Sequence, residues 1–174
     1  MNKKTLKEEK YEHIIHPFPP LYNADSKILI LGSLPSVKSR EQMFFYGHPQ
    51  NRFWKVISAV LQEETPTTIE EKRKMLLAHH VALWDTIYSC DIIGSSDSSI
   101  KNVVPTDLRT VVEQSKIQHI YCNGRTSGKY FEKYQQKTRG MTAEVLPSTS
   151  PANAAFGLEK LTAIWSEALK DSLG

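Results

Sequence analysis

The chain has 174 residues, of which 40% are hydrophobic and 24% charged, which is enough material for one buried core. Its formal net charge of +3 suits a polyanionic partner, although many enzymes without such a partner carry a similar excess. No run approaches the about 18 consecutive apolar residues that a membrane span needs, and the charged first ten residues lack the apolar core of a signal peptide. We therefore expect a cytoplasmic protein without membrane contact, with one domain at 27–174 behind a polar lead-in at 1–26.

Short apolar runs alternate along the chain with stretches of helical periodicity. The run at 27–31 (KILIL) ends at Gly32 and predicts a buried strand, and apolar residues at helical spacing from Asn51 onward predict a helix. Further strands are expected at 81–84, 117–122 and 142–146, and further helices at about 68–77, 105–112, 124–131 and 158–169. This alternation predicts a three-layer α/β/α sandwich with a central four-stranded parallel sheet.

Small and polar residues follow each predicted strand. In sheets of this kind ligands bind outside the carboxyl ends of the strands, because loops and helix N-termini converge there. The segments expected at this edge are 32–36 (GSLPS), 84–86 (WDT), 123–125 (NGR) and 147–153 (PSTSPAN). Asp85 is either a turn cap or an acceptor for an N–H of a purine, and the sequence leaves both open.

The longest predicted loop, 33–50, brings aromatic, amide and basic side chains together before the first helix. Helical spacing assigns Phe53 and Trp54 to the core, whereas Tyr46 lies outside that stripe and could stack on a planar base. Asn51 is either the N-cap of the helix or a side chain that meets a base edge or a water molecule.

In this order, the segments GSLPS, YGHPQNRFW and SPAN resemble the motifs of the uracil-DNA glycosylase superfamily, in particular its mismatch-specific and hypoxanthine branches. The resemblance covers most of the chain and implies a DNA-repair enzyme that hydrolyses the N-glycosidic bond of a damaged base. It implies that Asn51 is catalytic and that Tyr46 is the stacking aromatic. Mismatch-specific members read G-x-N-P where this chain has Leu34, and uracil-specific members often place a histidine where this chain has Ser148. The departure at Leu34 favours hypoxanthine over uracil as the substrate, and the departure at Ser148 removes the histidine that clamps the leaving base in those members.

Such an enzyme must extrude the target nucleotide, because the glycosidic bond is inaccessible in a stacked duplex. We expect Ser33 and Leu34 to line the base pocket with Tyr46 and Asp85. The residues expected to contact DNA, or to wedge into the vacated space, are Ser148, Ser150, Pro151, Ala152, Asn153, Arg125 and Lys129. Asp97 lies in a stretch that recurs in the hypoxanthine branch, without a role that can be derived.

Alternative functions stay open at this point. A uracil or G:T/G:U mismatch glycosylase would use the same fold, and a non-catalytic nucleic-acid-binding protein could have kept the fold without the chemistry. An esterase nucleophile at Ser33 lacks the G-x-S-x-G elbow. We expect neither a cofactor nor a metal, because no carboxylate or cysteine stands at ligand spacing around His48, His79 and His80. The expected partner is double-stranded or single-stranded DNA, bound by a monomer.

Overall fold

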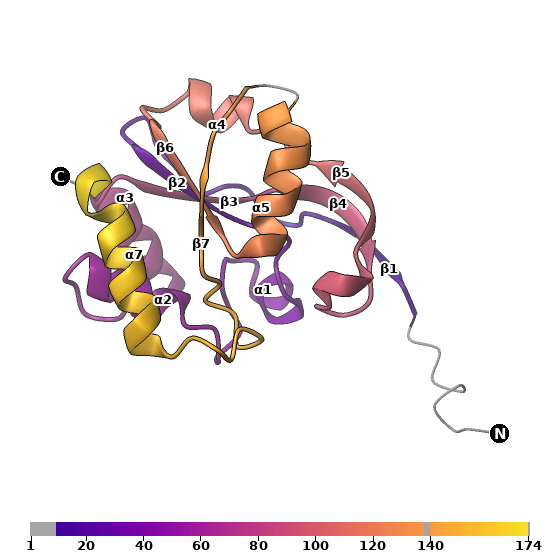
Figure 1. Cartoon of the computed structure of the whole chain (residues 1–174), viewed down its shortest axis with the longest axis horizontal. Helices are drawn as coiled ribbons and strands as arrows, with labels where there is room; N and C mark the ends of the chain where they lie inside the picture. Colours follow the sequence, from indigo (N-terminus) through magenta and orange to yellow (C-terminus); the bar gives the residue numbers. More distant parts are fainter. Residues whose placement is uncertain (1–9, 138–139, 174) are drawn as a thin grey trace.

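The computed structural model describes residues 10–137 and 140–173 (Figure 1). The strands are β1 (Glu12–Ile15), β2 (Ile28–Gly32), β3 (Val81–Asp85), β4 (Ile87–Ile92), β5 (Lys101–Pro105), β6 (His119–Asn123) and β7 (Glu144–Leu146). The helices are α1 (Val37–Gln42), α2 (Phe53–Val60), α3 (Ile69–Ala78), α4 (Arg109–Glu113), α5 (Arg125–Phe131) and α7 (Leu158–Leu173), with a 3-10 turn η2 (Asp97–Ser99) and a π turn η3 (Glu132–Gln136). None of the helices in these residues is long and apolar enough to cross a membrane.

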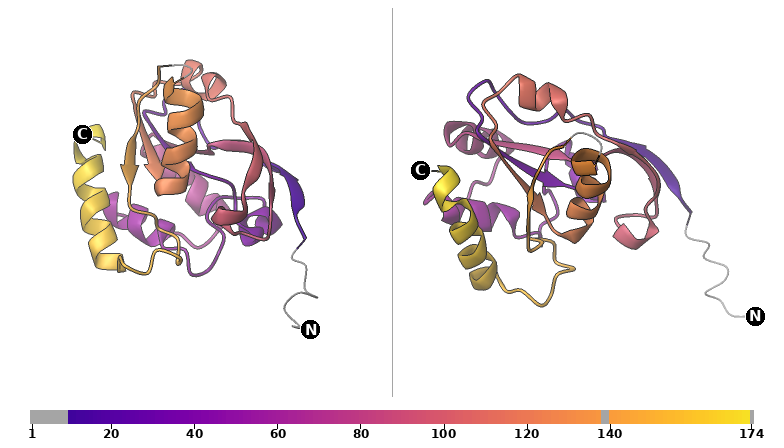
Figure 2. Two further views of the ribbon diagram at one scale, coloured as in Figure 1. Left: turned by 45° about the vertical axis from the view of Figure 1, so that its right-hand side comes forward. Right: turned by 45° about the horizontal axis from the view of Figure 1, so that its top comes forward.

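A four-stranded parallel sheet forms the centre of the molecule, in the order β3-β2-β6-β7. Every residue of β2 and β3 is buried, as their unbroken apolar runs predict. Helix α5 lies on one face of the sheet, and α2 with α7 lies on the other (Figure 2). The predicted α/β fold with four parallel strands is therefore confirmed. Because β2 and β3 pair in register up to Gly32 and Asp85, the last residues of both strands lie side by side.

A second sheet, antiparallel and in the order β1-β4-β5, was not predicted. The expected lead-in at 1–26 differs from the structure in its described part, since β1 pairs with β4 and the side chains of Phe18 and Leu21 are buried. Residues 1–9 lie outside the described residues. The helix expected from 105 is also displaced, because β5 continues through Pro105 and α4 begins only at Arg109.

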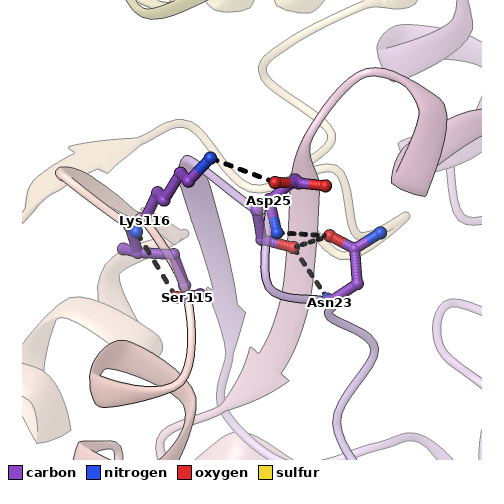
Figure 3. A network of polar contacts seen from close by, with 6 residues as sticks. Asn23, Asp25, Ser115 and Lys116 are labelled. Atoms are coloured by element: carbon purple, nitrogen blue, oxygen red, sulfur yellow. Dashed lines mark hydrogen bonds and ion pairs between the residues drawn. The ribbon is translucent and has the colours of Figure 1, made fainter.

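Polar contacts tie the turns that precede β2 and β6 at the amino edge of the central sheet (Figure 3). The ammonium of Lys116 lies 3.1 Å from Asp25 Oδ1, and the Lys116 amide donates to the carbonyl of Ser26 at 2.9 Å. Asn23 accepts a bond from the Asp25 amide at 2.9 Å. The ion pair between Lys116 and Asp25 is exposed and contributes little to stability.

Candidate active site

A cavity of about 540 Å³ opens at the carboxyl edge of the central sheet. The chain leaves β2 toward β3 and leaves β6 toward β7, in opposite directions along the sheet, so the cavity lies at the point where the strand order diverges. Its lining includes most of the residues singled out in the sequence: Ser33, Leu34, Tyr46, Asn51, Asp85, Arg125, Ser148, Ser150, Pro151 and Ala152. Ser33 and Ala152, which are 119 positions apart in the sequence, thereby line the same cavity.

The floor of the cavity carries a buried carboxylate, Asp85, which is only 4% exposed. Its Oδ2 accepts a hydrogen bond of 2.6 Å from Nε2 of His16, whose side chain is fully buried. His16 follows β1 and packs on the ring of Trp84, with the ring centroids 4.2 Å apart. No hydrogen bond within the described residues reaches Oδ1 of Asp85, so this oxygen is the acceptor that the floor offers to a ligand.

Gly32 makes room for this carboxylate. A β-carbon at position 32 would lie 2.5 Å from Oδ1 of Asp85 and 3.4 Å from the hydroxyl of Tyr46, and the first of these distances is a clash. The missing side chain therefore lets the ends of β2 and β3 approach with a carboxylate and a phenol between them. The glycine that closes the predicted strand at 27–31 thus has a steric role in the site.

Tyr46 lines the cavity with a backbone φ of +52°. Its ring stacks on Phe53, with the centroids 4.0 Å apart, so only the opposite ring face is free for a base. The hydroxyl is buried without a hydrogen-bond partner in the described residues. Burial, and then the charge of Asp85, raise the pKa of Tyr46 far above its ordinary value, so the phenol stays protonated.

Asn51 lies two residues before α2 and lines the cavity, whereas the N-cap position of the helix is Arg52, whose side chain makes no capping bond. Its Oδ1 accepts from the amide of Phe53 in the first turn of α2 and from the hydroxyl of Thr149, both at 2.9 Å. Its Nδ2 has no hydrogen-bond partner within the described residues. The oxygen of the amide is thus engaged in holding the fold, and the nitrogen is left for a ligand.

Arg52 holds the loop after β7 against the start of α2. Its guanidinium donates to the carbonyls of Ser150 at 2.8 Å and Asn153 at 3.1 Å, to that of Thr149 at 3.4 Å, and to that of Phe156. One side chain therefore satisfies four carbonyls of a loop that has no regular secondary structure. Sequence reasoning missed Arg52, because an arginine beside a motif asparagine carries no signal that it binds backbone.

Two of the residues expected at the site do not line the cavity. The amide of Asn153 donates to the carbonyl of Ser148 at 3.0 Å and closes the loop on itself. The ammonium of Lys129 lies 5.3 Å from the ring centroid of Tyr130. The cavity also includes Asn123 and Thr149, which lie in two of the segments expected at this edge, and Asp97, for which no role was derived.

The chain is similar to known proteins over most of its length. The profile of the uracil DNA glycosylase superfamily matches residues 19–171. A "Hypoxanthine DNA glycosylase" of Methanosarcina acetivorans is 36% identical over 143 residues, which cover 80% of this chain and 88% of that protein. A protein of the same name from Methanosarcina barkeri is 29% identical over 155 residues, which cover 88% of this chain and 96% of that protein.

A solved structure shows the same fold. It is a solution NMR structure from Methanosarcina acetivorans of a protein assigned provisionally as a uracil DNA glycosylase. The two folds agree with a TM-score of 0.77 at 30% sequence identity, over 92% of this chain and 100% of that one. The profile match and the identity to the relatives, each over most of the chain, lead to one conclusion: the protein belongs to the uracil DNA glycosylase superfamily.

Proposed function

We propose that this DNA glycosylase excises hypoxanthine from deoxyinosine in DNA. The observation that carries the proposal is that the Asn51 amide, the Asp85 carboxylate and the Tyr46 ring line one cavity, although they come from three separate segments. The names of the two relatives support the same substrate. Leu34, which stands where mismatch-specific members carry an asparagine, supports a site in which Asn51 is the catalytic amide.

The polar groups of the cavity complement the edge of hypoxanthine. Hypoxanthine carries a hydrogen on N1 and acceptors at O6, N7 and N3, whereas adenine has a bare lone pair at N1. Oδ1 of Asp85 has no hydrogen-bond partner in the described residues and can accept a hydrogen bond from N1–H of hypoxanthine. The same oxygen repels the lone pair on N1 of adenine. We therefore assign Asp85 to discrimination between the deaminated and the normal purine.

Catalysis in this proposal depends on charge that develops as the glycosidic bond breaks. The leaving purine becomes negative while the sugar becomes positive, and a fixed N–H donor at the base stabilises the transition state. The side-chain N–H groups of Asn51 supply that donor, or they donate to the oxygen of the attacking water. Ser33 and Leu34 form the wall of the pocket, and Tyr46 offers its free ring face to the extruded base.

The rim is the surface that we propose meets the DNA backbone. Pro151 and Ala152 are exposed at the mouth of the cavity, where a compact pair can fill the space left by the flipped nucleotide. Ser148, Ser150 and Asn153 belong to the same loop, and Arg125 and Lys129 on α5 provide positive charge for phosphates. Single-stranded and double-stranded substrates are both compatible with this rim.

The proposal is tested by excision from labelled duplexes that contain hypoxanthine, uracil, xanthine or ethenocytosine opposite each normal base, with alkali to cleave the abasic product. We expect single-turnover excision of hypoxanthine to be the fastest, and Asn51→Ala to slow it by about 100- to 1,000-fold. Asn23→Ala, the same substitution at the opposite edge of the sheet, should stay within about twofold of wild type.

Other outcomes of this experiment separate the alternatives. Faster excision of uracil or of mismatched thymine would assign the protein to the other substrates of the superfamily. Binding of the duplexes without excision of any base would identify a nucleic-acid-binding protein that kept the fold alone. An esterase role for Ser33 has no support, because no hydrogen bond joins its hydroxyl to a histidine within residues 10–137 and 140–173. A cytoplasmic location and a monomeric state stay predictions.

A further inference from the structure

A buried chain of hydrogen bonds links the end of β6 to the start of α2 through one threonine. Thr149 is fully buried, with no exposed surface. Its amide donates to Oδ1 of Asn123 at 3.0 Å, and its hydroxyl accepts from Nδ2 of Asn123 at 3.0 Å. The same hydroxyl donates to Oδ1 of Asn51 at 2.9 Å, and that oxygen also accepts from the amide of Phe53.

The direction of every bond in this chain is fixed by its two ends. The amides of Thr149 and Phe53 are backbone N–H groups, which only donate, so Oδ1 of Asn123 and Oδ1 of Asn51 must be acceptors. Nδ2 of Asn123 then donates to the Thr149 hydroxyl, which holds a single hydrogen. That hydrogen goes to Asn51. A flipped Asn51 amide would place its NH₂ against the backbone N–H of Phe53, which can only donate, so the flip is excluded.

Asn51 therefore presents hydrogens, and not its oxygen, to the cavity. Both hydrogens of its Nδ2 are free of partners within the described residues, and the residue lines the pocket. A donor in this place can stabilise negative charge on a leaving base, or it can donate a hydrogen bond to the oxygen of a water molecule. It cannot take a proton from that water.

We infer that Thr149 is a positioning residue, whose hydroxyl turns the amide of Asn51 so that its N–H groups face the base. The inference rests on the proposed function, in which Asn51 meets the extruded base. It adds Thr149 to the site and specifies that Asn51 acts as a hydrogen-bond donor. We assign the Thr149 hydroxyl no contact with the substrate, because the residue has no exposed surface and its only hydroxyl hydrogen goes to Asn51.

The decisive variant is Thr149→Val, which removes the hydroxyl but keeps the shape of the side chain. It also keeps the hydrogen bond from the backbone N–H of residue 149 to Oδ1 of Asn123. We expect the single-turnover rate on hypoxanthine DNA to fall by about 10- to 100-fold, because two hydrogen bonds are lost. The affinity for the uncleaved duplex should change by less than about threefold, since Thr149 does not contact DNA in this proposal. Thr149→Ser, which restores the hydroxyl, should recover the rate to within about threefold of wild type.

The matched control is Thr162→Val on α7, where the lost hydroxyl bond goes to the carbonyl of Leu158 at 2.8 Å, far from the cavity. Its rate should equal that of wild type. In a double-mutant cycle, Thr149→Val should add no further loss to Asn51→Ala, because Thr149 acts through Asn51. A Thr149→Val enzyme that is less stable but cleaves at the wild-type rate below its melting temperature would overturn the inference.

A second measurement tests the positioning role without any catalysis. The side-chain NH₂ resonances of Asn51 in a ¹H–¹⁵N correlation spectrum are assigned by their loss in Asn51→Ala. We expect them to shift in Thr149→Val and to stay in place in Thr149→Ser. Unshifted resonances in Thr149→Val would sink the inference even if the enzyme excises hypoxanthine. A wild-type protein inactive on hypoxanthine would sink the proposed function and leave this spectrum as the test of Thr149.

Discussion

The floor and the loop wall of the cavity are held in place by different means. The floor is the carboxylate of Asp85, which is held from behind by His16; their side chains are 6% and 0% exposed, and His16 packs on Trp84. The loop wall, residues 148–152, has no regular secondary structure and is attached by hydrogen bonds that it accepts from Arg52 and donates to Asn51 and Asn123. One wall is fixed by packing and the other by polar contacts.

The two walls also offer opposite hydrogen-bonding groups. The floor presents an acceptor, Oδ1 of Asp85, and the loop wall fixes Asn51 so that it presents donors. A base that carries one N–H and several lone pairs fits between them. The floor cannot rearrange without disturbing the central sheet, whereas the loop can be displaced by the loss of a few bonds. We therefore expect the floor to recognise the base in one fixed geometry, and the loop to adjust its conformation when it contacts DNA.

The largest effect is expected from a change that reverses the hydrogen-bonding polarity of Asn51, the residue that the loop wall orients. Asn51→Asp keeps the oxygen that accepts from Phe53 and Thr149 but replaces both N–H donors by a second acceptor. We expect excision of hypoxanthine to slow by about 100- to 1,000-fold, as for Asn51→Ala. Single-turnover kinetics measure this loss. An active Asn51→Asp enzyme would mean that the residue accepts a proton from water and does not donate to the base.

The next effect concerns what attaches the loop wall. Arg52→Ala removes the donors to four carbonyls, and we expect the free energy of unfolding to fall by about 2–4 kcal/mol. Arg52→Lys should recover part of this, because an ammonium cannot reach all four acceptors at once. Urea denaturation gives the stability, and limited proteolysis should cut the variant first within 147–156. Cleavage elsewhere first would show that the loop is held by other contacts.

A smaller effect is expected at the floor. His16→Phe preserves the packing on Trp84 but removes the donor to Asp85, so the carboxylate loses its fixed orientation. We expect the rate on hypoxanthine to fall by about tenfold, with weaker discrimination against adenine. His13→Phe is the matched control, since His13 also bonds an aspartate, Asp91 at 2.8 Å, but is 60% exposed. Equal rates for the two variants would remove His16 from the site.

The smallest effect is expected at the rim. Arg125→Ala should weaken duplex affinity by a few-fold and reduce the dependence of log affinity on log salt by about one unit, because one phosphate contact is lost. Lys129→Ala should do less, since Lys129 does not line the cavity. Binding titrations at several salt concentrations compare them. A larger effect at Lys129 would move the DNA path along α5, away from the mouth of the cavity.

The pattern of apolar runs predicted the central sheet, because buried parallel strands leave an unbroken apolar signal at 27–31 and 81–84. It also predicted the edge at which the site lies, since all parallel strands end on the same side. The antiparallel sheet escaped prediction because β4 begins after a single residue, Thr86, that separates it from β3, and β1 is short and mostly exposed. Periodicity over so few residues is weak.

The sequence predicted residues of the candidate active site only where they lie in a recognisable motif or directly after a predicted strand. Asn51, Tyr46 and Ser33 stand in motifs, and Asp85 follows a strand, so the sequence could bring them to one cavity. His16 acts on a residue 69 positions away, and Thr149 acts on one 98 positions away. Such partners become visible only when the fold places them. The direction of the amide of Asn51 is likewise decided by neighbours that no local pattern reveals.

Strand β1 contributes to the chemistry of the cavity as well as to the fold. It carries the chain to His16, so a gene shortened to start at codon 19 would encode a protein whose Asp85 lacks its imidazole neighbour. The same deletion would leave the backbone of β4 unpaired on one side, which invites association between molecules. For anyone adapting this protein as a laboratory reagent, the trimming point therefore belongs before residue 12.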